Sequence, residues 1–98
     1  MNKVFLQLWE ESERGWGTRP DGCSVHIDLN THKLYIEESY KDRSDEVPDT
    51  YERVVGDVMV AFVDDSLFDI IEVDKNIRLF ENELNNLINL EEIIINHD

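Results

Sequence analysis

The longest uninterrupted apolar run in the chain is VMVAFV, residues 58–63, and it is only six residues long. A membrane-spanning helix needs about 20 apolar residues, so no membrane span is expected. A short apolar run without alternation is typical of a strand that is buried on both faces. The run therefore predicts a strand in the interior of a sheet, around which the rest of the chain is arranged.

Two N-terminal segments alternate between core-facing and other side chains with the two-residue period of a strand. They are KVFLQLW, residues 3–9, and CSVHIDLN, residues 23–30. Because a structured loop joins them, we expect the two strands to pair in antiparallel fashion. The second strand is expected to turn three polar side chains outward, namely Ser24, His26 and Asp28.

Residues 31–43, THKLYIEESYKDR, fit two structures. The first is a helix with Thr31 as its N-cap, and the second is a hairpin that returns through KLYIE. We favour the helix. SDEVPD, residues 44–49, then forms a polar linker, because Pro48 disfavours a helical conformation at the residue before it.

The remainder of the chain predicts two short helices and two more strands. One helix begins at a capping Asp65, and the other spans residues 81–88. The strands are IRLF, after a turn at residues 74–76, and the EEIII segment near the C-terminus. Helical spacing gives each helix an apolar stripe; these are Leu67, Ile70 and Ile71 in the first and Leu84, Leu87 and Ile88 in the second.

With 98 residues, the chain is expected to form one domain, residues 1–98. We predict a small α+β fold: a mainly antiparallel sheet of about four strands, with two or three short helices packed on one face. The single cysteine and the absence of a signal-peptide pattern indicate a cytoplasmic protein.

The net charge of −14 restricts the partners of this domain. Residues 54–98 hold 11 acidic residues against two basic ones. Such a surface repels nucleic acid and attracts basic protein surfaces, so direct nucleic-acid binding is not expected. An acidic inhibitor that imitates DNA and docks on a basic nucleic-acid-binding surface is one hypothesis, and an ordinary soluble acidic domain is the simpler interpretation.

Residues 14–20, RGWGTRP, contradict this acidic character, because they hold two arginines and no acid. Gly15 and Gly17 flank Trp16 and permit positive φ angles, while Pro20-Asp21-Gly22 is typical of a turn. Trp16 is expected either to project from the loop or to fold back over the sheet. The arginines either bind an anion or pair with nearby carboxylates.

An Arg/Trp/Gly loop at residues 12–22 suits a phosphorylated, nucleotide-like ligand or an anchor in a protein interface. It matches no complete phosphate-binding motif. The ligand-binding residues that we predict on the loop and the outer strand face are Arg14, Trp16, Arg19, Asp21, Ser24 and His26.

The pattern WEES-x-R-G-W-G-x-R-P-D-G-x-S-x-H resembles the opening of small proteins from bacteriophages and low-GC Gram-positive bacteria. The resemblance is strongest over residues 8–26 and weaker up to Pro48. It implies a phage or mobile-element setting, in which small acidic proteins counter host defence by mimicking DNA or by sequestering nucleotide second messengers. In that setting Arg14, Trp16, Arg19, Asp21 and His26 would be the important positions.

Catalysis, metal binding and cofactors are not expected. Cys23 and His26 point to opposite faces of a strand, and neighbours along one strand face lie roughly 6.5–7 Å apart, too far for a Ser-His-Asp triad. The three histidines lack a metal-ligand spacing. We therefore expect a non-enzymatic binding protein, with a small phosphorylated ligand or a basic host protein as its partner, and possible homo-oligomers.

Overall fold

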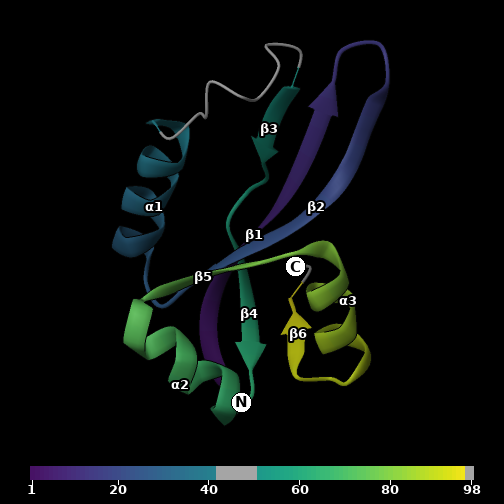
Figure 1. The fold of residues 1–98 in the computed structure, drawn as a ribbon. Helices are drawn as coiled ribbons and strands as arrows, with labels where there is room; N and C mark the ends of the chain where they lie inside the picture. The colour runs from purple at the N-terminus through teal and green to yellow at the C-terminus, as the bar shows by residue number, and fades with distance from the viewer. Residues whose placement is uncertain (42–50, 97–98) are drawn as a thin grey trace.

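The computed structural model describes residues 1–41 and 51–96, which form a small α+β domain with a six-stranded antiparallel sheet and three helices (Figure 1). The elements follow one another as β1 (Asn2–Glu13), β2 (Gly17–His26), α1 (Leu29–Lys41), β3 (Tyr51–Val55), β4 (Met59–Val63), α2 (Asp65–Asp74), β5 (Asn76–Leu79), α3 (Glu81–Asn89) and β6 (Ile93–Ile95).

The sheet has more strands than the four expected, because β1 is long enough to pair with two segments along the same edge. Its first half pairs with β4 and its second half with β3. The strand order is β5-β2-β1-β4-β6, with β3 beside β1. β4 is therefore an interior strand, as its apolar sequence predicts. Only one of its faces is fully buried, since Ala61 and Val63 are enclosed while Phe62 is half-buried.

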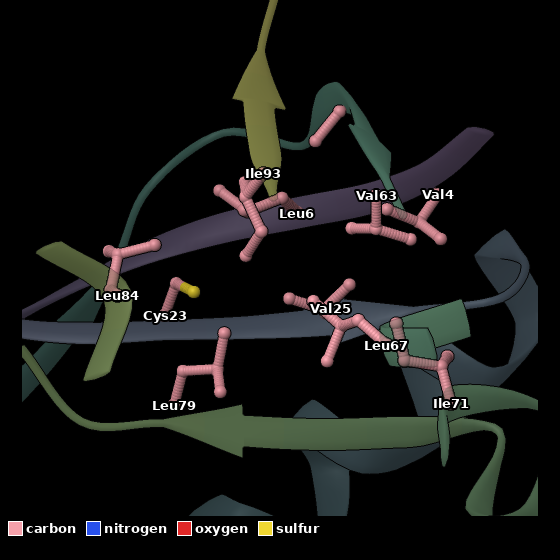
Figure 2. Close-up of a cluster of buried hydrophobic side chains, with 11 residues drawn as sticks. Val4, Leu6, Cys23, Val25, Val63, Leu67, Ile71, Leu79, Leu84 and Ile93 are labelled. Carbon is pink, nitrogen blue, oxygen red and sulfur yellow. The ribbon is translucent and has the colours of Figure 1, made fainter. Parts of the chain in front are cut away.

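The main core lies between the sheet and two helices, α2 and α3 (Figure 2). Val4 and Leu6 of β1 pack there with Cys23 and Val25 of β2. The helices contribute Leu67, Ile71 and Leu84, and β6 adds Ile93. The stripes expected on the two helices are only partly buried, because Ile70 and Ile88 are exposed.

Helix α1 lies on the opposite face, so the expectation that all helices share one face is wrong. His26 contacts His32 and Tyr35 of α1, whereas its neighbour Val25 lies in the main core. Successive residues of a strand point to opposite faces, which separates α1 from α2 and α3. The prediction of a helix is confirmed for residues 31–41. Residues 42–49, which include the expected linker, lie outside the described residues.

Both predicted N-caps are displaced toward the N-terminus, by three residues in α1 and by one in α2. The carboxylate of Asp28 accepts hydrogen bonds from the backbone N–H and the hydroxyl of Thr31, at 2.7 and 3.0 Å, so Asp28 rather than Thr31 closes the start of α1. In α2 the cap is Asp64, which accepts from the N–H of Leu67 at 2.9 Å. Asp65 instead accepts a hydrogen bond from the side chain of Asn2.

Candidate functional site

The predicted loop at residues 12–22 is a β-hairpin whose strands, β1 and β2, continue almost to its tip. The connection comprises only residues 14–16, closed by a 3.0 Å hydrogen bond from the N–H of Trp16 to the carbonyl of Glu13. Gly15 and Gly17 have φ angles of 87° and 94°, a region that glycine enters without steric cost. The two glycines thus allow the tight reversal between β1 and β2 that Figure 1 shows, and Trp16 lies within this reversal.

Trp16 projects from this tip with 84% of its surface exposed, so it does not fold back over the sheet. Arg14 beside it is also exposed. An indole this exposed contributes almost nothing to folding, because the hydrophobic gain depends on the apolar area removed from water. The hairpin tip is therefore a surface whose apolar area is still available for contact.

Arg19 lies on the hairpin arm, where it pairs with a carboxylate on the neighbouring strand. Its Nε and Nη2 donate to Oε2 of Glu11 at 3.0 and 2.8 Å. The two residues are directly opposite in the β1–β2 register. An exposed pair of this kind contributes about 0–1 kcal/mol, so it orients the arginine more than it stabilises the fold.

Asp21 and Gly22 form a bulge in β2 rather than the turn expected from Pro20-Asp21-Gly22. Two residues of β2 lie opposite Trp9, between the Leu8–Cys23 and Glu10–Pro20 pairs. Gly22 has a φ of 78°, and its N–H donates to Glu81 at 2.9 Å. A Cβ at this position would lie 1.9 Å from the carbonyl oxygen of Leu79, so only glycine fits.

The bulge directs Asp21 toward Arg78 of β5, which is not among the predicted site residues. Nη2 of Arg78 donates to Oδ2 of Asp21 at 2.9 Å and also to its backbone carbonyl. The guanidinium stacks on the indole of Trp9, with 4.3 Å between Cζ and the ring centroid. Asp21 is thus engaged in holding β5 against the hairpin. The signal in the sequence was that Arg78 is one of only two basic residues after residue 53.

Ser24 and His26 are completely buried, so the expectation that they face outward is wrong. Ser24 accepts a 2.9 Å hydrogen bond from the indole Nε1 of Trp9. The ring of His26 lies 5.0 Å from that of His32 and 5.4 Å from that of Tyr35. The period-two pattern puts both residues on the face opposite the main core, but it cannot reveal that α1 packs on His26 and that Trp9 lies against Ser24.

Burial shifts the pKa values of two side chains in opposite directions. Desolvation, with a smaller contribution from His32, lowers the pKa of His26 to about 4, so this imidazole is neutral at pH 7. Among the described residues neither of its ring nitrogens has a hydrogen-bond partner. Burial raises the pKa of the Cys23 thiol to about 12, which leaves it as a small apolar residue of the core.

The six predicted site residues therefore lie in four separate places and do not meet in one site. Arg14 and Trp16 lie at the tip, Arg19 is paired on the arm, and Asp21 is bound to Arg78. The other two, Ser24 and His26, are inside the fold. Within residues 1–41 and 51–96, no three metal-ligating side chains gather into a potential metal site. No described helix is both long and apolar enough to cross a membrane.

Comparisons with protein-family models, with curated proteins and with solved structures found no match to this chain.

Proposed function

We propose that this chain is a non-enzymatic binding protein that docks on a basic protein surface and anchors itself there with Trp16. The observation that carries the proposal is the 84% exposure of Trp16 at the hairpin tip. Tryptophan and arginine are the residues most enriched among interface hot spots, and the tip presents one of each. A convex tip fits a pocket on a partner better than it encloses a ligand, because small-molecule sites are concave.

The charge of the chain supports a basic partner. At −14, the domain attracts positively charged surfaces over the screening length of the solution, which favours fast association. The exposed acids of α2, Asp65, Asp69, Glu72 and Asp74, are part of that field. The resemblance of residues 8–26 to phage proteins leads us to propose a host-defence protein in the cytoplasm as this partner.

Photo-crosslinking from the tip tests the proposal. A benzoylphenylalanine at position 16, in cells that naturally produce the chain, should crosslink to one protein with a basic surface. The matched control has the same residue at position 73, because Val73 is an equally exposed apolar residue at 80% but lies on α2. A crosslink that forms equally from both positions, or only from position 73, would refute the tip as the anchor.

A second candidate function is the sequestration of a phosphorylated, nucleotide-like ligand. It is favoured by the presence of Arg14 and the open indole face of Trp16 in the same tip, which suit a phosphate and a base. A thermal melt with cyclic di- and trinucleotides and ADP-ribose derivatives tests it. A ligand whose concentration is 100 times its dissociation constant adds about 2.7 kcal/mol to the free energy of unfolding. This raises the melting temperature by roughly ten degrees or more. Such a shift, lost in Arg14→Ala and Trp16→Ala, would replace the protein-docking proposal.

A further inference from the structure

The layer between the sheet and α1 contains buried imidazole nitrogens without hydrogen-bond partners. His26 of β2 is completely buried, and neither its Nδ1 nor its Nε2 has a partner among the described residues. Nδ1 of His32, on α1, is also buried and has no partner within that part of the chain. Buried polar atoms are nearly always hydrogen-bonded or bound to an ion, so three such nitrogens in one place point to a ligand that they share.

The two imidazoles lie at a separation that suits one shared metal ion. Their ring centroids are 5.0 Å apart and their planes are inclined by 68°. With Zn–N distances of about 2.0–2.1 Å and a tetrahedral angle, two imidazole ligands hold their ring centroids about 5 Å apart. Local spacing in the sequence does not reveal this pair, because His26 ends a strand and His32 belongs to the helix that follows it.

The surroundings of this histidine pair favour a cation. Burial lowers the pKa of His26 to about 4 and also lowers that of His32, so at pH 7 both imidazoles are in the neutral form that binds metals. The carboxylate of Asp28 acts on His26 in the opposite direction, because it lies close enough to favour positive charge there. His32 is only half-buried, which leaves an approach for an ion from solvent.

The types of ligand determine which metal fits the histidine pair. Imidazole nitrogens suit zinc, copper, nickel and iron, whereas calcium and magnesium require oxygen ligands. The single cysteine of the chain, Cys23, belongs to the main core, on the opposite face of the sheet from His26. Because no thiolate reaches the pair, the softest ion, Cu⁺, is less suited to it than a borderline divalent ion such as Zn²⁺.

We propose that His26 and His32 together bind one divalent transition-metal ion of the zinc class between β2 and α1. The described residues bring no third histidine, cysteine or carboxylate into the group, so water completes the coordination of the ion. The ion gives the buried nitrogens their missing partner and ties α1 to the sheet. Because metal binding adds to the stability of the state that binds it, the ion also stabilises the fold. The proposal is independent of the Trp16 tip.

Isothermal titration calorimetry of the chelator-treated chain with zinc chloride tests the site. We expect one Zn²⁺ ion to bind per chain, in the presence of excess Mg²⁺ that occupies surface carboxylates. His32→Phe should weaken Zn²⁺ binding by about 100-fold or more, because loss of an outer-shell partner alone costs about 10–100-fold. His32 is half-buried, so this change is compatible with folding. His26→Phe should have the same effect, and circular dichroism shows whether each variant is folded.

The matched control is His97→Phe, which removes the third histidine of the chain and should leave the affinity for Zn²⁺ unchanged. Three results would overturn the proposal: no binding of Zn²⁺ in excess Mg²⁺, a folded His32→Phe variant that binds Zn²⁺ like the wild-type chain, or equal weakening by His97→Phe. The absorption spectrum of the Co²⁺ complex is a second test. It should show tetrahedral bands without a thiolate charge-transfer band, and a thiolate band would place the ion at Cys23 instead.

Discussion

At the scale of single residues, Gly22 is the position at which the hairpin depends on the absence of a side chain. Its positive φ and the proximity of the Leu79 carbonyl leave no room for a Cβ. The bulge that it makes possible directs Asp21 to Arg78, and Arg78 in turn covers Trp9. One glycine thus determines how β5 and α3 meet the sheet.

We expect Gly22→Ala to lower the free energy of unfolding by about 3 kcal/mol or more, because a steric clash adds to the strain of the positive φ. Gly15→Ala is the matched control, since Gly15 also has a positive φ but no atom within 4 Å of an added Cβ. It should cost only about 1 kcal/mol. Urea denaturation measures both values, and equal losses would show that the clash with Leu79 does not occur.

His26 makes the stability of the fold depend on pH. Its pKa is lowered from 6.5 to about 4 by burial, so the unfolded chain takes up a proton before the folded chain does. The stability that this neutral imidazole contributes is complete above pH 6.5 and is lost as the pH falls from 6.5 toward 4, by about 3 kcal/mol at most. His32, whose pKa burial also lowers, acts in the same direction.

The His26→Phe variant isolates this effect, because it keeps a ring of similar size and removes the titrating group. The difference in unfolding free energy between the variant and the wild-type chain should grow in favour of the variant between pH 6.5 and 4. The comparison also cancels the titration of the carboxylates, which both chains share. A difference that stays constant over this range would refute a buried, neutral His26.

At the scale of secondary-structure elements, α2 offers a test of where the helix begins. The carboxylate of Asp64 accepts the capping hydrogen bond from the N–H of Leu67, so Asp64→Ala should lower the free energy of unfolding by about 1 kcal/mol. Asp65→Ala removes the same charge without removing the cap and should cost less. Thermal melts of the two variants decide the assignment, and a larger loss from Asp65→Ala would favour the cap expected from the sequence.

Most elements could be predicted from the sequence, because they are determined by local periodicity. Three such patterns depend only on neighbours along the chain: the alternation of residues 23–26, the apolar run of β4 and the helical spacing after residue 64. The sequence does not predict β3, because YERVV follows a polar, proline-containing stretch and its pairing depends on the length of β1. Pro20-Asp21-Gly22 predicts a turn although the structure has a bulge, since the Pro-Asp-Gly sequence suits both.

The candidate site was less predictable than the fold, because burial depends on distant parts of the chain. Trp9 and Trp16 have the same side chain, yet one is 3% and the other 84% exposed. Ser24 and His26 alternate as outward-facing residues should, but Trp9 lies against Ser24 and α1 packs on His26. Local sequence identifies the face on which a side chain lies, whereas tertiary packing decides whether this face reaches solvent.

At the scale of the whole molecule, the net charge of −14 opposes folding, because compaction brings like charges together. We expect the melting temperature to rise as sodium chloride is increased from about 0.02 to 0.5 M, since the Debye length falls from tens of ångströms to a few. Differential scanning calorimetry at fixed pH measures this. A melting temperature that is constant or falls with salt would show that self-repulsion is not significant in this fold.

The negative charge and the exposed tip are the two observations behind our central proposal, that the chain docks on a basic protein through Trp16. The most direct measurement is the dissociation constant of the crosslinked partner, once purified, for the wild-type chain, Trp16→Ala and Val73→Ala. We expect Trp16→Ala to weaken binding about 30-fold or more, as the loss of a hot spot of about 2 kcal/mol requires, and Val73→Ala to have no effect. Binding by Trp16→Ala within about twofold of the wild-type affinity would contradict the account.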